Sequence, residues 1–484
     1  MAVIGLDVGT TGCKAVVYNQ EGKILTSSYL EYDIIAINGN YEINPNIVWD
    51  KVSEVLLSVT KKCAEAIDAI GISTFGESAV LIDKEGNVLC NAMLYTDPRG
   101  IEECKKLIEY ENITKVAAHP MYTISKILWM RENREEIKKR VYKYLLFEDF
   151  IIYKLTGEFC ISFSQAARTG AFDVRQSTFC EDILKLADCN KEQFSIPSPS
   201  GTIAGVVKTL EYLYGVPVVT GGQDQVCAAL GAGIQDDGEA VLGMGTVECI
   251  TPIYSDPDKI THDKIIQGYC CVPYVVYGKY VTYAYSYTGG ALLKWFRDKI
   301  AIELSNQVDN LYEHFNYSVQ DLETELLLIP HFAGAATPYM DTNAVGAIVG
   351  LSVATTREEI YRAILEGCCF EMAINMEQLN EAGIIIDRLI ATGGGAQSKV
   401  WLQMTADVLQ IPVGVMKNTE AGTAGAAMLA GTAVGIFSTL KQAVERFCIP
   451  GDTYVPDLSR QKYYQNKYRK YKKMYTSIKE IMEG

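Results

Sequence analysis

The sequence lacks the features that mark several common classes of protein. Its 484 residues include 44 Lys and Arg against 59 Asp and Glu, a formal net charge of −15. Proteins that bind a nucleic-acid backbone use cationic side chains to displace counterions, so this balance argues against a nucleic-acid partner. The motif G-x-x-x-x-G-K-[ST] is absent, and no complete G-x-G-x-x-G follows a predicted strand. The P-loop and Rossmann routes to phosphate binding are therefore unsupported.

Export signals, metal motifs and membrane spans are also lacking. The first residues (MAVIGLD) have neither the positively charged region nor the long apolar stretch of an export signal, so we expect a cytoplasmic protein. The 14 cysteines include no C-x-x-C pair, and several of them, such as Cys13, Cys227 and Cys369, lie in apolar runs, which predicts reduced core residues. Residues 421–440 are uncharged and long enough to span a bilayer, but they include four glycines together with Thr and Ser. A buried helix explains that composition better, and we expect no membrane partner.

What the sequence does contain is enough apolar residues, 48%, for two or three domains with cores. Near the N-terminus, apolar runs separated by turn residues predict an antiparallel meander followed by a helix and a further strand. The expected strands are 3–8, 14–18, 23–29 and 69–73, and the helix begins at Asn44-Pro45. This order is typical of an α/β domain.

The same order of elements returns in the second half of the chain. We expect strands at 239–242 and 247–253, a helix at 358–379 and a strand at 388–392. The similarity of the two halves suggests that both face a common ligand. The polar segment 234–238 marks the expected border, giving domains 1–234 and 235–484.

The turn Asp7-Val8-Gly9-Thr10-Thr11-Gly12 is the first candidate phosphate site. Its glycines permit a tight turn in which backbone amides and two hydroxyl groups face an anion. Asp7 can hold Mg²⁺ directly or through water. Taken alone, the motif is equally typical of an ordinary hairpin turn.

Two further glycine-rich turns follow predicted strands. In residues 220–225 (TGGQDQ), Asp224 stands at the end of a strand, where α/β proteins place catalytic groups, although it could simply cap the next helix. In residues 391–398 (ATGGGAQS), three glycines let a flat ring or a phosphate approach the backbone.

In this order and spacing, the three turns resemble the FGGY family of carbohydrate kinases. The resemblance covers essentially the whole chain and includes segments 71–73, 94–99, 123–129, 154–158, 330–350 and 362–367. It implies two actin-like, ribonuclease-H-like domains with the active site in the cleft between them. It also implies ATP and Mg²⁺ as cofactors.

The resemblance assigns a role to each candidate residue. Asp224 matches the family's catalytic base, and Asp7 would serve the metal ion. The sugar-contacting positions would be Gly76, Glu77, Asp97, Asp224 and Gln225. The nucleotide-binding positions would be Thr10, Thr11, Gly245, Thr246, Gly394, Gly395 and Gln397.

The implied reaction is ATP-dependent phosphorylation of a hydroxyl group on a neutral sugar or polyol. A pentulose such as xylulose is the leading acceptor, and glycerol or another polyol is the alternative. The substrate segments depart from the familiar subfamilies: Gly76 precedes Glu77, Tyr95 replaces the usual Trp, and Gln225 follows Asp224 as in glycerol kinases. The sequence leaves a homodimer open.

Two other classes of protein are weighed against this one. A non-kinase actin-fold ATPase would need no carboxylate at position 224. A Rossmann oxidoreductase using glycines 393–395 would need an acidic residue on the next strand, but Glu420 falls after strand 413–416. In the tail, 460–482, tyrosines at helical spacing among lysines predict a docked helix with a solvated basic face, although they could also stack on nucleotides.

Overall fold

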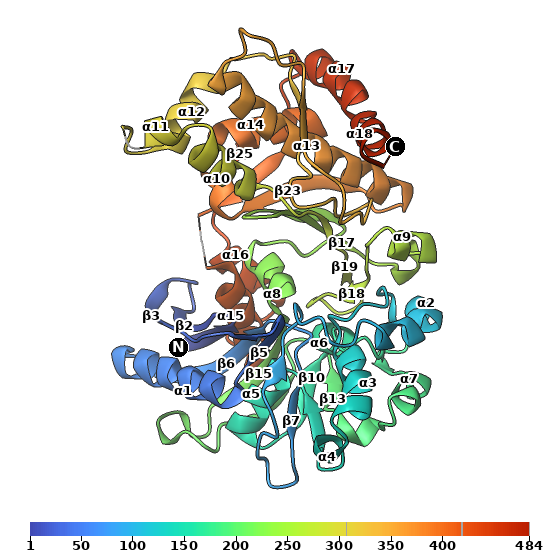
Figure 1. The fold of residues 1–484 in the computed structure, drawn as a ribbon. Coiled ribbons are helices and arrows are strands. Elements are labelled where there is room, and N and C mark those ends of the chain that lie inside the picture. The colour runs from blue at the N-terminus through green and yellow to red at the C-terminus, as the bar shows by residue number, and fades with distance from the viewer. Residues whose placement is uncertain (306, 418–419, 484) are drawn as a thin grey trace.

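The computed structural model describes residues 1–305, 307–417 and 420–483. Two domains lie one above the other in the view of Figure 1, each built around one large sheet. Most of the first half of the chain forms the lower domain, and most of the second half forms the upper one.

The sheet of the first domain has six strands in the order β14-β15-β6-β1-β2-β3. β1 pairs antiparallel with β2 and parallel with β6, and β6 pairs parallel with β15. The strands are β1 (Ala2–Val8), β2 (Gly12–Asn19), β3 (Ile24–Glu31), β6 (Ile67–Thr74), β14 (Ile203–Val206) and β15 (Pro217–Gln223).

The sheet of the second domain repeats this arrangement. β16 pairs antiparallel with β17 and parallel with β23, and β23 pairs parallel with β24. The strands are β16 (Gly238–Met244), β17 (Glu248–Tyr254), β18 (Val272–Pro273), β19 (Tyr280–Val281), β20 (Ala284–Ser286), β23 (Ile386–Thr392), β24 (Val413–Met416) and β25 (Pro450–Tyr454). A hairpin followed by two parallel strands therefore occurs twice, and the expected pair of actin-like domains is confirmed.

Helices cover both sheets. α1 begins where the sequence predicts, because Asn44 accepts a hydrogen bond from the Asn46 amide and Pro45 occupies the first turn. Thr356 and Glu359 form a capping box at the start of the 25-residue α13. The helices of the first half are α1 (Pro45–Lys62), α2 (Glu111–Thr114), α3 (Thr123–Asn133), α4 (Glu135–Lys138), α5 (Phe147–Thr156), α6 (Phe163–Ala167), α7 (Glu181–Leu186) and α8 (Asp224–Gly231).

The second half contributes the remaining helices and several short strands complete the fold. These helices are α9 (His262–Ile266), α10 (Gly290–Lys299), α11 (Ile302–Ser305), α12 (Leu311–Val319), α13 (Arg357–Glu381), α14 (Lys399–Leu409), α15 (Ala421–Ala433), α16 (Leu440–Phe447), α17 (Gln461–Tyr471) and α18 (Met474–Glu483). The short strands are β4 (Ile35–Ile37), β5 (Asn40–Ile43), β7 (Val80–Ile82), β8 (Ala92–Met93), β9 (Lys143–Leu145), β10 (Cys160–Ser162), β11 (Phe172–Asp173), β12 (Thr178–Phe179), β13 (Ile196–Ser198), β21 (Leu327–Ile329) and β22 (Ala347–Val349).

Helix α15 comes late in the sequence but packs on the first sheet (Figure 1). A Cβ atom at Gly5 would lie 1.9 Å from the Thr423 carbonyl oxygen, and one at Gly71 would lie 2.0 Å from that of Ala426. Backbone therefore meets backbone, which explains the many small residues in this helix. Among the described residues, no helix has both the length and the apolar composition that a membrane crossing requires.

The C-terminal tail forms two helices, α17 and α18, rather than one. Tyr464 and Tyr471 are buried as expected, but Lys467 is buried too, where a solvated lysine face was expected. Its ammonium group pairs with Glu366 of α13, which also binds Arg362. Such a group can be buried because a carboxylate and the Thr324 carbonyl oxygen accept its hydrogen bonds.

Candidate active site

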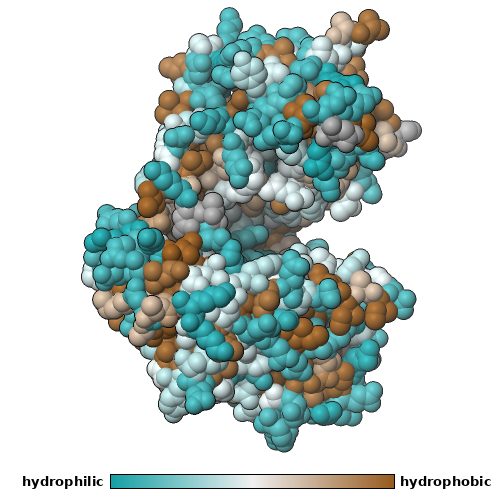
Figure 2. Space-filling view, turned by 90° about the vertical axis from the view of Figure 1, so that its left-hand side faces the viewer, coloured by the Kyte–Doolittle hydropathy of each residue, from teal (hydrophilic) through white to brown (hydrophobic). Residues whose placement is uncertain are grey.

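A deep cleft separates the two domains on one side of the molecule (Figure 2). In the first domain, Asp7 is the penultimate residue of β1 and Asp224 begins α8 directly after β15. These two strands flank β6 in a parallel arrangement, so their carboxyl ends lie at one edge of the sheet. Burial together with the charges of Asp7 and Glu77 raises the pKa of Asp224, so the three carboxylates lie within electrostatic reach of one another.

The first turn, Gly9 to Gly12, is closed by a hydrogen bond of 2.9 Å from the Gly9 amide to the Gly12 carbonyl oxygen. The Tyr32 hydroxyl donates to the Gly9 carbonyl oxygen at 2.5 Å and helps to fix the turn. Thr10 is half-buried and Thr11 is exposed. The two hydroxyl groups predicted to serve phosphates are thus accessible on a rigid turn.

Asp7 lies beside the N-terminal end of α15. Its Oδ1 accepts a 2.7 Å hydrogen bond from Ser73, and its Oδ2 lies 3.1 Å from the Cβ position of Gly422. Burial raises the pKa of Asp7 despite that hydrogen bond, and the charge of Glu420 adds to the shift. A carboxylate held in this way gains from a cation beside it.

The donor set around Asp7 fits Mg²⁺. That ion binds one or two carboxylates and keeps several water or phosphate ligands. In the ranges that the structure describes, no group of three or more His, Cys, Asp or Glu side chains could form a closed metal cage. Asp7 alone would leave the other positions around such an ion to water or phosphate oxygens.

The predicted nucleotide residues of the second domain line one cavity of about 1270 Å³. Two turns meet there, because a Cβ atom at Gly393 would lie 2.8 Å from the Met244 carbonyl oxygen. The loop at Gly245 and Thr246 is held by the amides of Gly290 and Ala291 at the start of α10. The cavity-lining residues that we predicted are Gly245, Thr246, Gly394, Gly395 and Gln397.

Asp224 owes its position to a distortion of β15. The pairing of β15 with β6 shifts register between Thr220 and Gly222, and Gly222 has a φ of +154°. A Cβ atom at Gly221 would lie 2.1 Å from the Ile72 carbonyl oxygen, so only glycine fits this approach. Burial, with the charges of Asp7 and Glu77, raises the pKa of Asp224 to about 7.

Glu77 is buried and pairs with Arg168, which lies 5.2 Å from the centre of the Tyr122 ring. Its φ of +66° is rare for a residue other than glycine, and such conformations cluster at functional sites. The Thr123 hydroxyl donates to the Glu77 carbonyl oxygen at 2.6 Å and helps to hold this conformation. The neighbouring Gly76 packs against the Arg168 side chain.

Asp97 is engaged differently from the other predicted sugar residues. Both of its carboxylate oxygens accept hydrogen bonds from Arg99, at 2.8 and 2.7 Å, and one also accepts from the Tyr41 amide. Although burial opposes it, these hydrogen bonds hold the pKa of Asp97 below its ordinary value. Asp97 is therefore neutralised by Arg99, whereas Gln225 is exposed beside Asp224.

Several residues at the site were not found from the sequence. Arg168 follows Glu77 by 91 positions, and no motif marks it as the partner. Tyr283 comes from the second domain and reaches Gln223. Trp295 and Tyr312 line the nucleotide cavity from α10 and α12. The aromatic composition of those two segments was visible in the sequence, but an aromatic residue in an amphipathic helix is more often part of a core.

The arrangement is suited to phosphoryl transfer. A loose transition state needs alignment of the reactants and stabilisation of charge, together with a carboxylate that takes a proton from the attacking hydroxyl group. Two actin-like domains, one with a large cavity and the other with Asp224 at a strand end, provide these parts. The fold and the site thus define the class, an ATP-dependent phosphotransferase.

Comparison with known proteins gives the family. The models of the N-terminal and C-terminal domains of the FGGY family of carbohydrate kinases match residues 2–231 and 257–434, and the chain belongs to this family. It is therefore a carbohydrate kinase, which uses ATP to phosphorylate a small-molecule sugar or related compound.

Similar proteins match over almost their full length. A xylulose kinase of Bacillus subtilis is 28% identical, with 99% of this chain and 97% of the relative covered. A glycerol kinase of Aquifex aeolicus is 29% identical, with 95% of each covered. The crystal structure of a xylulose kinase from Rhodospirillum rubrum superposes with a TM-score of 0.91 at 23% identity, covering 100% of both chains, which supports the fold.

Proposed function

We propose that this enzyme transfers the γ-phosphoryl group of ATP to a neutral pentulose such as xylulose, with Asp224 as the general base. The observation that carries the proposal is the placement of Asp224 directly after β15, within electrostatic reach of Asp7 and Glu77, where its pKa is raised to about 7. A general base works best when its pKa lies near the working pH. The family relationship and the xylulose kinases among the relatives support the same assignment.

In the proposed mechanism, Asp224 uses its two oxygens differently. Oδ1 accepts hydrogen bonds from the Gln225 amide at 2.7 Å and from the Gln223 side chain. Within the described part of the chain, no hydrogen bond to Oδ2 is found. Oδ2 would therefore accept the proton of the attacking hydroxyl group while Oδ1 stays anchored.

The remaining predicted residues would hold the nucleotide. Thr10 and Thr11 would contact phosphates from the first domain, and Gly245 and Thr246 from the second. Gly394, Gly395 and Gln397 would lie along the adenosine. When bound at Asp7, Mg²⁺ would neutralise charge on the phosphates.

The acceptor is proposed to be uncharged because the arginines near the sugar site already have partners. Arg99 pairs with Asp97 and with Glu42 at 2.7 Å each, and Arg168 pairs with Glu77. A substrate carboxylate would therefore meet Asp224 without a compensating charge from either of these two arginines. At about 5 Å and an effective dielectric constant of about 20, that repulsion costs about 3 kcal/mol.

Glycerol is the second candidate acceptor, favoured by one observation. Gln225 follows Asp224, as in glycerol kinases, and its exposed side chain lies beside the base. We further propose a cytoplasmic enzyme with domains 1–234 and 235–484, in which α15 of the second domain packs on the sheet of the first. A homodimer remains a prediction, which sedimentation would check.

A coupled assay of ADP release tests the proposal. Xylulose, ribulose, glycerol, ribitol and gluconate are compared by kcat/KM for the wild type and for Asp224→Asn. We expect a pentulose to lead and the variant to lose about 10²- to 10⁴-fold in kcat with nearly unchanged ATP binding. Gluconate in first place would contradict a neutral acceptor. A variant that keeps more than about a third of the wild-type kcat would contradict the base assignment, given the size of that expected loss.

A further inference from the structure

A chain of hydrogen bonds joins Asp224 to the second domain. The Gln223 side-chain amide donates through Nε2 to Asp224 Oδ1, and its Oε1 accepts from the Tyr283 hydroxyl at 3.1 Å. Tyr283 lies directly before β20 in the sheet of the second domain. Tyr283 and Gln223 are 8% and 6% exposed, so water has little access to these bonds.

The surroundings fix which way the Gln223 amide faces. Its Oε1 also accepts from the Gln225 backbone amide at 3.1 Å. Both groups that meet Oε1 are therefore donors, and a flipped amide would place Nε2 against the Gln225 N–H. Tyr283 and the start of α8 thus hold Nε2 toward Asp224.

Gln223 itself is held at a constrained place in the chain. It is the last residue of β15 and the N-cap of α8. Its backbone N–H donates to the Ser164 hydroxyl oxygen at 3.1 Å. The register shift before Gly222 turns it toward the second domain. A side chain fixed at both ends can hold a neighbouring carboxylate in one orientation.

We propose that Gln223 and Tyr283 are positioning residues for the catalytic base, and that Tyr283 acts through Gln223. The pair binds Oδ1 so that Oδ2 faces the acceptor, and it ties this geometry to the placement of the second domain. The inference rests on Asp224 being the base. Neither residue would touch the reacting atoms.

Tyr283→Phe and Gln223→Met test the proposal. The first keeps the ring and removes the hydroxyl group. The second keeps the length of the side chain and removes its hydrogen bonds with Asp224, Tyr283 and the Gln225 backbone amide. Losing a donor to a carboxylate raises its pKa, so the acid limb of the pH profile should move upward. We expect about half a unit for Tyr283→Phe and about one unit for Gln223→Met. Their kcat should fall about 3-fold and about 10-fold, with KM for ATP unchanged.

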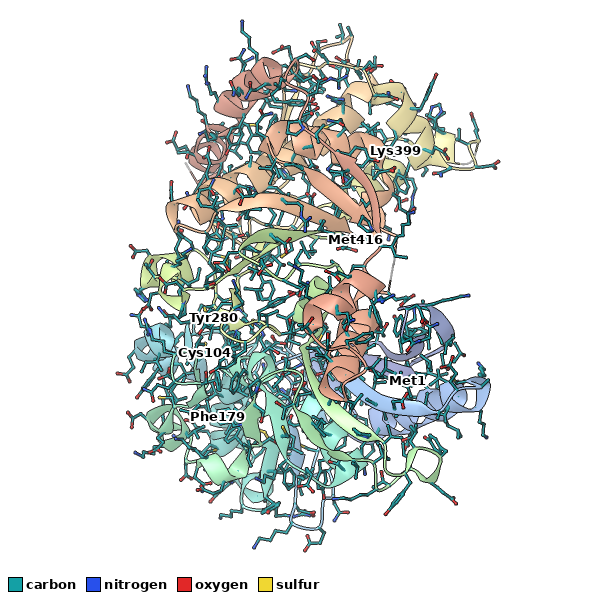
Figure 3. All side chains as sticks on the ribbon, turned by 180° about the vertical axis from the view of Figure 1, so that it is seen from behind. Met1, Cys104, Phe179, Tyr280, Lys399 and Met416 are labelled. Carbon is teal, nitrogen blue, oxygen red and sulfur yellow. The ribbon has the colours of Figure 1, made fainter. Side chains whose placement is uncertain are left out.

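The double variant shows whether Tyr283 acts through Gln223. If it does, Tyr283→Phe should cost nothing further once Gln223 is Met, whereas independent effects would multiply. Tyr280→Phe is the matched control. Tyr280 lies in β19 between the two domains (Figure 3). Burial raises its pKa, and so do nearby acidic groups, among them Asp256 and Asp258. Asp224 is not one of these groups, so Tyr280→Phe should leave the proposed base unaffected.

The outcomes separate this inference from the proposed function. If Asp224→Asn loses activity as expected but Tyr283→Phe keeps the wild-type pH profile and kcat, the positioning role is wrong and the base assignment survives. Multiplying effects in the double variant would likewise overturn it. If Asp224→Asn stays active, the base assignment is what fails. Because Gln223→Met also removes a helix cap, its melting temperature is measured to show that it is folded.

Discussion

At the scale of single residues, the surroundings of Asp224 disfavour its ionised form. Burial and two nearby carboxylates raise its pKa to about 7. Below that pH the group is protonated and cannot accept a proton. We expect kcat/KM for the acceptor to fall about tenfold per pH unit below about pH 7 and to level off above it.

This pH dependence is measured at saturating Mg²⁺ and ATP between about pH 5 and pH 9, a range that brackets the pKa of the proposed base. Because Mg²⁺ beside Asp7 would offset one of the two charges that raise the pKa of Asp224, the acid limb should lie at or somewhat below about pH 7. Circular dichroism over the same range is the control that the chain stays folded. A flat profile down to pH 5.5, about a unit and a half below the expected limb, would contradict the prediction.

The same raised pKa makes Asp224 costly for stability. A carboxyl group with a pKa higher in the folded than in the unfolded state stabilises the fold at low pH, and this stabilisation is lost as the pH rises through the folded-state value. Asp224→Asn removes the charge but keeps an oxygen that can accept from Gln225. Its melting temperature should exceed that of the wild type above about pH 7 and should match it near pH 4, the ordinary pKa of the group.

Asp236→Asn is the matched variant, because Asp236 is exposed and lies in the segment between α8 and β16. It should leave the melting temperature unchanged across the same range. A stabilisation by Asp224→Asn that persists in full at pH 4, near the unfolded-state pKa, would show that charge is not its cause.

The sequence marks Asp224 and Asp7 as candidates, because each combines a carboxylate with a strand end and a glycine-rich turn, and the structure places both at the carboxyl ends of strands that flank β6. It could not predict what neutralises Glu77 and Asp97. Arg168 reaches Glu77 across 91 positions, and pairing over such separations depends on the fold. The orientation of Asp97 toward Arg99 likewise follows from packing with the Tyr41 backbone.

At the scale of elements, the contact of α15 with the first sheet depends on the absence of side chains. A Cβ atom at Gly71 in β6 would lie 2.0 Å from the Ala426 carbonyl oxygen. Because backbone atoms on both sides cannot yield easily, Gly71→Ala should cost about 3 kcal/mol or more in the free energy of unfolding. Urea denaturation followed by circular dichroism measures this.

Gly278→Ala provides the comparison. Gly278 has a φ of +78° but no atom within 4 Å of its Cβ position, so only backbone strain is introduced, about 1 kcal/mol. If the two variants lose equal stability, close packing of α15 is not what excludes a side chain at Gly71.

Periodicity and turn residues predicted the strands of both hairpins, the helix that became α13 and a buried helix in residues 421–440, of which α15 takes up Ala421–Ala433. They did not predict which domain that helix joins. A segment rich in Gly and Ala indicates that the helix packs closely against another element. It does not indicate which element that is, because this depends on the three-dimensional arrangement. For the same reason Lys467 was expected in solvent, since its partner Glu366 belongs to another helix.

At the scale of the whole molecule, the proposed phosphate contacts come from both domains. Thr10 and Thr11 lie on the first, and Gly245 and Thr246 on the second. Contact with one triphosphate from both sides requires the domains to approach each other, and closure excludes water as a competing acceptor. We expect the radius of gyration to decrease when ATP and acceptor are both bound.

Small-angle scattering on Asp224→Asn measures this decrease, because the variant should bind both substrates while turning them over about 10²- to 10⁴-fold more slowly. The same protein with neither ligand, and with acceptor alone, provides the controls. An unchanged distance distribution in the presence of both ligands would contradict closure.

The position of α15 also determines the order in which the molecule can be completed on the ribosome. The last strand of the first sheet ends at Gln223, but the helix that covers it begins at Ala421, about 200 residues later. At about 5–20 residues per second, translation takes about 10–40 s to cover that interval. During that interval the sheet face that α15 covers stays exposed in the nascent N-terminal domain, and the folding of this domain can finish only after nearly nine-tenths of the chain has been synthesised.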